Sequence, residues 1–237
     1  MTKLIVDNEF WDLFPQAEIY LLRVNDLNNE ISDEKDAVMA NLLKQAAKAG
    51  EKFVPDEPIS QNEVIAQWRQ AFQKFKTKKG ARSSIEALLK RVQKGNIVRP
   101  INPLVDLYNV ASMANGVPIG AEDTSKITGD MHLGLAQGGE DFWPLGAEES
   151  AAALEGEICY YDDQGAVCRC FNWREAERTM ITEESQQAVI VIEAINAQQA
   201  QRAQEAQTQL QSLLAEHLGV QAEAEIINIE NKEATIA

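Results

Sequence analysis

The chain has 237 residues, of which 45% are hydrophobic, and its formal net charge is −15. This length and apolar content are enough to bury a sizeable core, which excludes an intrinsically disordered chain. The longest strongly apolar run, residues 188–192, is far shorter than the ~20 residues of a membrane helix, and the amino terminus lacks an apolar stretch of signal-peptide length. We therefore expect a cytoplasmic protein with no membrane partner.

Apolar patterns predict the elements of the first hundred residues: strands at 3–6 and 18–24, a helix over 32–49, a proline-bounded loop over 54–59, and helices opening at Ser60 and Ser83. The last two open with capping-box patterns, Ser60-x-x-Glu63 and Ser83-x-x-Glu86. The first of them is expected to run to Phe75, with its aromatic stripe in the core. The candidate core residues of this region are Phe10, Trp11, Phe14, Trp68, Phe72, Ile85, Leu88, Leu89 and Val92.

A further helix is predicted to begin at Asn102-Pro103 and to end at Gly116. Asparagine can cap the free N–H groups, proline suits the first helical position, and glycine suits the left-handed residue that closes a helix. Two polar residues, Asp106 and Asn109, lie on a stripe of this otherwise apolar helix. The residues after it, 120–123, are predicted to form a loop with two adjacent carboxylates.

The rest of the chain is predicted to be rich in strands, at residues 131–136, 157–161, 166–172, 188–195 and 224–229, with a helix over 198–218 that ends at Gly219. Helices and strands mix without a regular βαβ repeat. We therefore expect an α+β fold with a mixed or antiparallel sheet packed with several helices.

Three cysteines, Cys159, Cys168 and Cys170, form an odd set without the spacing of a zinc site, and only His132 and His217 could complete one. No metal and no cofactor is expected. The alternation of Cys168 and Cys170 predicts two reduced thiols on the same face of a strand.

Charge is segregated along the chain. Residues 60–100 carry ten basic and two acidic side chains, a net charge of +8, whereas the remaining residues carry 12 basic and 35 acidic groups, a net charge of −23. Because charges in water are screened beyond ~8 Å at physiological salt, a local basic face can still bind phosphate. The alternative is a solvated helix surface with a hinge at 76–80. The candidate phosphate contacts are Lys76, Lys78, Lys79, Arg82 and Arg99, although Arg99 could instead bind a backbone carbonyl.

Five blocks occur in a specific order: residues 83–89 (SSIEALL), 99–106 (RPINPLVD), 115–120 (NGVPIG), 139–146 (GEDFWPLG) and 172–175 (NWRE). Together they resemble the editing module of the β-subunit of bacterial phenylalanyl-tRNA synthetase, and especially its freestanding relatives. The resemblance covers roughly residues 60–220 and implies the fold of that module. It implies a single domain over 1–237, with an N-terminal part over 1–59, the module-like core over 60–220 and a strand and tail over 221–237. A complete synthetase is excluded, because the chain is short and has no glycine-rich nucleotide loop.

The same resemblance implies an editing pocket around residues 120–123. Gly120 stands where the synthetase has a pocket histidine, Asn109 matches a pocket asparagine, and Arg174 falls near the glutamate that reads misattached tyrosine. The implied catalytic residues are Asn109, Glu122 and Asp123. The implied substrate-binding residues are Gly120, Ala121, Asn172, Trp173, Arg174 and Glu175. For Glu122 and Asp123 the alternative is a carboxylate that caps a helix or pairs with Lys126, and for Trp173 it is a core aromatic.

Cleavage of a mischarged aminoacyl-tRNA ester requires that the ester be held, one water placed and the oxyanion stabilised, which agrees with the absence of a nucleophile motif. The expected function is therefore tRNA binding with hydrolysis of mischarged aminoacyl-tRNA in translation quality control, with tRNA and not DNA as the partner. Arg174 argues against tyrosine, and acids at Glu122, Asp123 and Glu175 favour a cationic or hydrogen-bonding amino acid, such as an arginine analogue. The alternatives are a non-catalytic tRNA-binding module and a binder of free amino acid. The oligomeric state stays open.

Overall fold

A strand that is buried along its whole length organises the fold. In the computed structural model, which describes residues 1–237, all seven residues of β8 (Ala188–Ala194) are buried. Both faces of its sheet must therefore be covered. This four-stranded sheet is antiparallel throughout, in the order β3 (Ile119–Asp123), β8, β2 (Glu18–Val24) and β9 (Ala222–Ile227).

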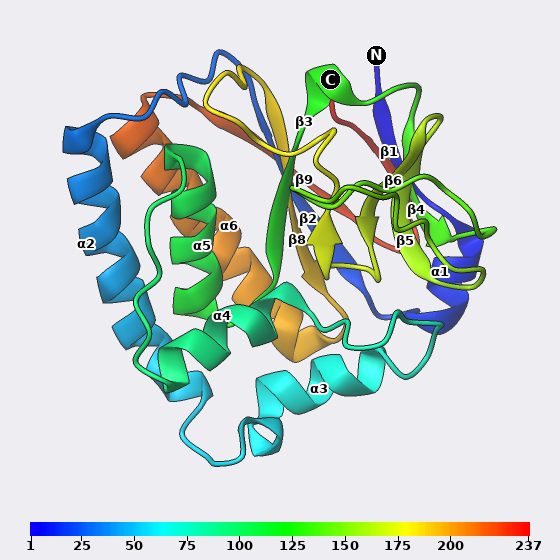
Figure 1. The fold of residues 1–237 in the computed structure, drawn as a ribbon, viewed down its shortest axis with the longest axis horizontal. Coiled ribbons are helices and arrows are strands. Elements are labelled where there is room, and N and C mark those ends of the chain that lie inside the picture. The colour runs from blue at the N-terminus through cyan, green and yellow to red at the C-terminus, as the bar shows by residue number, and fades with distance from the viewer.

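A second sheet covers one face of the first (Figure 1). Its order is β10 (Glu233–Thr235), β1 (Lys3–Val6), β4 (Met131–Leu135), β5 (Ile158–Asp162), β6 (Gly165–Arg169) and β7 (Arg174–Glu175). The pair β1 and β4 is parallel and the other pairs are antiparallel, so this sheet is mixed. The predicted α+β fold with mixed and antiparallel sheets is confirmed.

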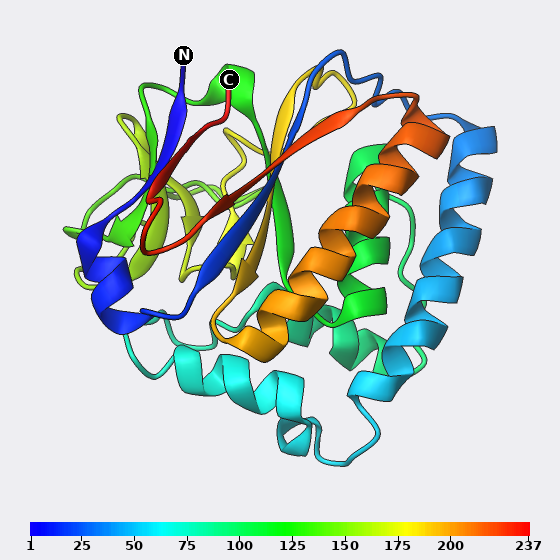
Figure 2. The ribbon, with the colours of Figure 1, turned by 180° about the vertical axis from the view of Figure 1, so that it is seen from behind.

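Helices cover the other face of the four-stranded sheet. The α-helices are α1 (Asn8–Leu13), α2 (Asp33–Gly50), α3 (Glu63–Ala71), α4 (Ser84–Gln93), α5 (Pro103–Asn115) and α6 (Ala197–Leu218), with short 3₁₀ turns at Glu51–Phe53, Ile59–Gln61 and Thr124–Lys126. Figure 2 shows α6 lying along the sheet, with α2 outside the sheet-facing helices. No helix is long and apolar enough to cross a bilayer.

Strand alternation divides the core between the two faces of the four-stranded sheet. Leu22 and Ile190 pack with the helical layer, whereas Leu21 and Val191 pack toward the six-stranded sheet. The predicted aromatic core is confirmed, with Trp68 only 1% exposed.

The helix ends show which local signals operate. Asn102 caps α5 by accepting a hydrogen bond from the Val105 N–H, at 3.1 Å, and Gly116 closes the helix at φ 64°. The two predicted capping boxes are wrong. Helix α3 begins at Glu63, three residues later than expected, and ends at Ala71. Helix α4 begins as predicted, but the Ser83 side chain makes no capping bond, and the Glu86 carboxylate pairs with two arginines and does not reach back to the cap.

Two further predictions are corrected. Residues 120–123 belong to strand β3 and not to a loop, because they pair with β8 over their whole length. Strand β6 ends at Arg169, and Cys170 lies beyond it at φ 47°, so the two thiols do not share a strand face. Helix α1 and the short strands β7 and β10 were not expected from the sequence.

Candidate functional site

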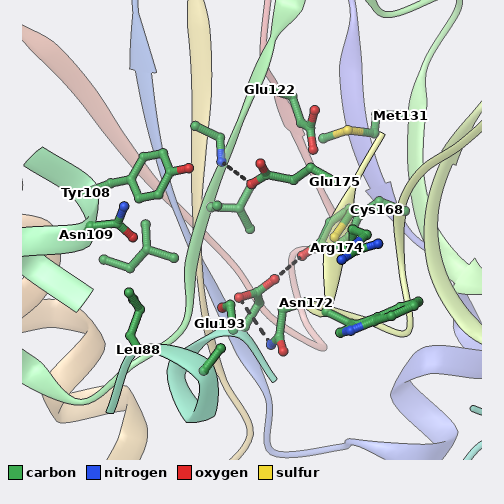
Figure 3. A pocket seen from close by; sticks show the side chains of 18 of the residues that line it. Leu88, Tyr108, Asn109, Glu122, Met131, Cys168, Asn172, Arg174, Glu175 and Glu193 are labelled. Carbon is green, nitrogen blue, oxygen red and sulfur yellow. Dashed lines mark hydrogen bonds between the residues drawn. The ribbon is translucent and has the colours of Figure 1, made fainter. Parts of the chain in front are cut away.

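A cavity of about 260 Å³ is lined by residues of both sheets and of α4 and α5. We call it the central cavity. Strands β3 and β8 form one wall, β5 and β6 with the 172–175 segment form another, and α4 and α5 close it (Figure 3). Segments that are far apart in the sequence thus supply one site.

Eight of the nine predicted pocket residues line this cavity: Asn109, Gly120, Ala121, Glu122, Asn172, Trp173, Arg174 and Glu175. They come from α5, from β3 and from the segment around β7. Their roles remain predictions, but the structure brings these side chains and backbones to one place.

Asp123 does not line the central cavity, so the structure does not bring it together with the other eight predicted residues. Neighbouring residues of a strand point to opposite faces, so Glu122 and Asp123 cannot both face the cavity. Asp123 Oδ1 accepts a hydrogen bond from the Ser125 N–H, at 3.0 Å, and Oδ2 accepts one from the Ser185 hydroxyl, at 2.7 Å. Lys126 Nζ lies 4.0 Å from Asp123 Oδ2. Asp123 is therefore a buried cap of the turn that follows β3.

The Glu175 carboxylate lies directly against the backbone at Gly120 and Ala121. Glu175 Oε1 accepts a hydrogen bond from the Ala121 N–H, at 3.3 Å, at the outer edge of β3. A Cβ atom added at Gly120 would lie 2.8 Å from the same carboxylate oxygen. The glycine at this position thus leaves the space that the Glu175 carboxylate fills.

Glu193 was not predicted as a site residue, yet it lines the central cavity and is 3% exposed. It accepts hydrogen bonds from the Tyr160 hydroxyl, at 3.1 Å, and from Asn172 Nδ2, at 3.4 Å. The sequence did contain a signal, since Glu193 is an acid within the apolar run of β8. A charged residue is rarely buried unless it is paired or functional.

The three cavity glutamates hold their protons unusually tightly. Burial raises the pKa of Glu175 to about 7 and that of Glu193 to about 8. Burial, together with the nearby charge of Glu175, raises the pKa of Glu122 well above its ordinary value, and its Oε2 has no hydrogen-bond partner. These glutamates do not form a cluster that could hold a metal ion. Near pH 7, and without a ligand in the cavity, some of these carboxyl groups are therefore protonated and neutral.

Cationic side chains line the cavity together with these acids. Arg174 is exposed, and its guanidinium carbon lies 5.4 Å from the centre of the Trp173 ring. Arg91, which was not predicted as a site residue, is also exposed and comes from the face of α4 that carries Ser84, Ala87 and Leu88. The acid in this part of the cavity is the half-buried Glu175, which directly follows Arg174 in the chain (Figure 3).

Of the five predicted phosphate-binding residues, three line one pocket and two do not. Lys78, Lys79 and Arg82 line a second hollow of about 280 Å³ beside the start of α4, which we call the basic pocket. Lys76 and Arg99 are exposed and line neither the central cavity nor the basic pocket.

Comparison with known proteins gives a family match and likenesses to solved structures. Residues 67–218 match the B3/4 domain family. No curated protein matches the chain. One similar solved structure is an N-terminal fragment of the phenylalanyl-tRNA synthetase β-subunit from Pyrococcus horikoshii, with 14% identity and a TM-score of 0.49. The likeness covers 92% of this chain and 49% of that fragment, so the chain spans about half of the fragment's length.

Proposed function

The chain belongs to the B3/4 domain family, which is found in phenylalanyl-tRNA synthetase β-subunits, and from this premise we propose that it binds tRNA and hydrolyses the ester bond of mischarged aminoacyl-tRNA. The proposal is that it does so in the cytoplasm, without a synthetase attached. The observation that carries the proposal is the convergence of Asn109, the 120–122 segment and the 172–175 segment on the central cavity.

The chemistry needs few groups, because the ester is already activated. A base with a pKa near the working pH serves best to remove a proton from the attacking water, and the pKa of Glu175 is about 7. The Asn109 amide can donate a hydrogen bond to the developing oxyanion, since it lines the same cavity. Burial keeps Tyr108 neutral by raising its pKa well above 10, so its hydroxyl is a second donor beside Asn109.

The substrate amino acid is proposed to be cationic or rich in hydrogen-bond donors. Glu122, Glu175 and Glu193 offer acceptors inside the cavity, and a positive charge close to a carboxylate stabilises its ionised form. The preference does not rest on Arg174, which is exposed. A cavity of about 260 Å³ is small among ligand sites, which suits one amino acid better than a larger ligand.

The proposal is tested by single-turnover deacylation of a panel of tRNAs charged with cationic, aromatic and small aliphatic amino acids. The wild-type chain is expected to act on a cationic member of the panel. Asn109→Ala and Glu175→Gln should each slow the reaction by about 100-fold, the size expected for an oxyanion donor or a general base. Glu184→Gln is the matched control, because Glu184 is exposed and lies outside the cavity. Rates that the two cavity variants leave unchanged would contradict the assignment.

Simple measurements distinguish the proposed function from two alternatives. A non-catalytic tRNA-binding module would bind tRNA with no hydrolysis above background. A binder of free amino acid, which the small central cavity also suits, would be stabilised thermally by its ligand. That stabilisation should survive replacement of Lys78, Lys79 and Arg82 by Glu, whereas binding of tRNA should not.

A further inference from the structure

The charged side chains of the basic pocket are mainly cationic, whereas those of the central cavity include three glutamates. Four cations line it, Arg69, Lys78, Lys79 and Arg82, and Glu86 is the only acid among its lining residues. The pocket lies at the amino-terminal end of α4, which begins at Ser84 and is ten residues long. The partial positive charge of a helix amino terminus adds to these four cations.

Glu86 orients the arginines. Its carboxylate is 2% exposed and accepts hydrogen bonds from Arg69 Nε, at 3.0 Å, and Arg69 Nη2, at 2.7 Å, while Arg82 Nε lies 3.2 Å from Oε1. This pairing uses the Nε side of Arg82 and leaves its two terminal nitrogens available. One acid against four cations leaves the pocket with a net charge of +3.

Two further donors in this pocket have no partner in the protein. The Ser83 hydroxyl and Trp68 Nε1 are buried, with their residues 2% and 1% exposed, and neither atom makes a hydrogen bond. Both residues line the basic pocket. Ser83 is also the residue before α4, where a serine side chain normally caps the helix, and this one does not. Buried polar groups are nearly always satisfied, so unpaired donors beside four cations indicate an anionic ligand.

We propose that the basic pocket binds one phosphate group of an RNA strand whose 3′ end enters the central cavity. This inference rests on the proposed function. The two sites share the first turn of α4, because Ser83 lines the basic pocket and Ser84 lines the central cavity. The sugar that carries the aminoacyl ester is joined to the sugar–phosphate backbone, so one RNA strand can engage both sites. The guanidinium and ammonium groups, the hydroxyl and the indole N–H are all donors that a phosphate accepts.

The test uses Ser83→Ala, which removes one uncharged donor, and Lys79→Gln, an exposed position whose replacement should not disturb folding. Lys44→Gln is the control, because it makes the same charge change on an exposed residue of α2 outside both sites. The first probe is inorganic phosphate, compared with chloride at equal ionic strength by thermal unfolding. The second probe is uncharged tRNA, titrated over a series of salt concentrations.

Phosphate is expected to stabilise the wild-type chain and the Lys44→Gln variant but neither pocket variant. For tRNA, Ser83→Ala should raise the Kd about tenfold, as loss of one hydrogen bond to a charged group does. Lys79→Gln should reduce the slope of log K against log salt by about 0.7, the value for one contact to a single strand.

Three other results would contradict the inference, each in a different way. Stabilisation by phosphate with unchanged tRNA binding in both variants would show that the pocket takes a free phosphate compound and would overturn the RNA assignment. Normal hydrolysis of mischarged tRNA together with unchanged tRNA binding in both variants and no effect of phosphate would overturn this inference alone. Failure of the wild-type chain to bind tRNA would overturn both this inference and the proposed function.

Discussion

Gly120 shows how one missing side chain determines the contents of the central cavity. The resemblance predicts a pocket histidine in place of this glycine, and in the structure the space above Gly120 holds the Glu175 carboxylate. A histidine at 120 and the observed Glu175 position exclude each other, because a Cβ at 120 would already lie 2.8 Å from Oε1.

Gly120→Ala is expected to displace the Glu175 carboxylate and break its bond from the Ala121 N–H. Gly120 has no positive φ, so the alanine should cause no backbone strain. Deacylation should therefore fall about as far as in Glu175→Gln, while the melting temperature changes little. Ala37→Gly, on an exposed residue of α2 outside the central cavity, gives a control for general loss of stability. Full activity in Gly120→Ala would show that the carboxylate position is not needed.

Glu193 and Glu175 make stability depend on pH in a defined direction. Their pKa values are about 8 and about 7 in the folded chain, against about 4.3 for a glutamate in an unfolded chain. Between these values the folded chain holds protons that the unfolded chain has released. The free energy of unfolding should therefore fall as pH rises from about 4.3 to about 8, by up to about 1.4 kcal/mol per pH unit for each group.

Glu193→Gln should remove part of this pH dependence, because glutamine does not titrate. Urea unfolding at several pH values gives the measurement, and the difference in slope between wild type and variant isolates Glu193 from the other acids. Equal slopes for the two proteins would show that Glu193 titrates normally.

The start of α5 is fixed by two buried asparagines. Asn102 Oδ1 accepts from the Val105 N–H and from Asn29 Nδ2, at 2.9 Å, and Asn29 Oδ1 accepts from the Leu104 N–H, at 2.8 Å. Asn102→Ala should therefore cost about 2 kcal/mol or more in unfolding free energy, since it removes a cap and leaves the Asn29 amide short of a partner. Ser32→Ala, at the exposed cap of α2, should cost about 1 kcal/mol or less. Similar losses in the two variants would contradict the role of the buried pair.

The elements that the sequence predicted well are those with local signals. The Asn102-Pro103 start and the Gly116 stop of α5 depend on neighbours within four residues, and the sequence contains them all. Strand β3 has no such signal, because glycine, alanine and two acids have low strand propensity and its pairing partner β8 lies about 70 residues away. Expecting a loop there brought Asp123 into the site, since only a strand forces Glu122 and Asp123 to opposite sides. The Glu86 pairing with Arg69 and the burial of Glu193 between sheets are likewise products of distant packing.

The first segment of the chain supplies an interior strand to each sheet, whereas the last segment supplies an edge strand to each. Strand β2 lies between β8 and β9, and β1 lies between β10 and β4, so residues 1–59 supply central strands. The family match over 67–218 includes neither β1 nor β2. The single-domain arrangement proposed from the sequence therefore has a direct test in the 60–220 fragment.

A fragment of residues 60–220 is expected not to fold, because removing β2 strips a hydrogen-bonded neighbour and a buried face from β8. Circular dichroism and thermal unfolding of the fragment give the measurement. Removal of residues 230–237, which deletes the three-residue edge strand β10 and the buried Ile236 but no interior strand, should lower stability but leave a cooperative unfolding transition. A cooperatively folded 60–220 fragment would show that the core is independent of the N-terminal part.

The protonated glutamates of the central cavity also bear on the heat of ligand binding. A cationic amino acid that enters must draw Glu175 and Glu193 into their ionised forms, because its charge lowers their raised pKa values. Hydrogen ions then leave the protein and are taken up by the buffer. Calorimetric titration near neutral pH should consequently give enthalpies that vary with the ionisation heat of the buffer, and the slope of that variation counts the hydrogen ions released per molecule bound.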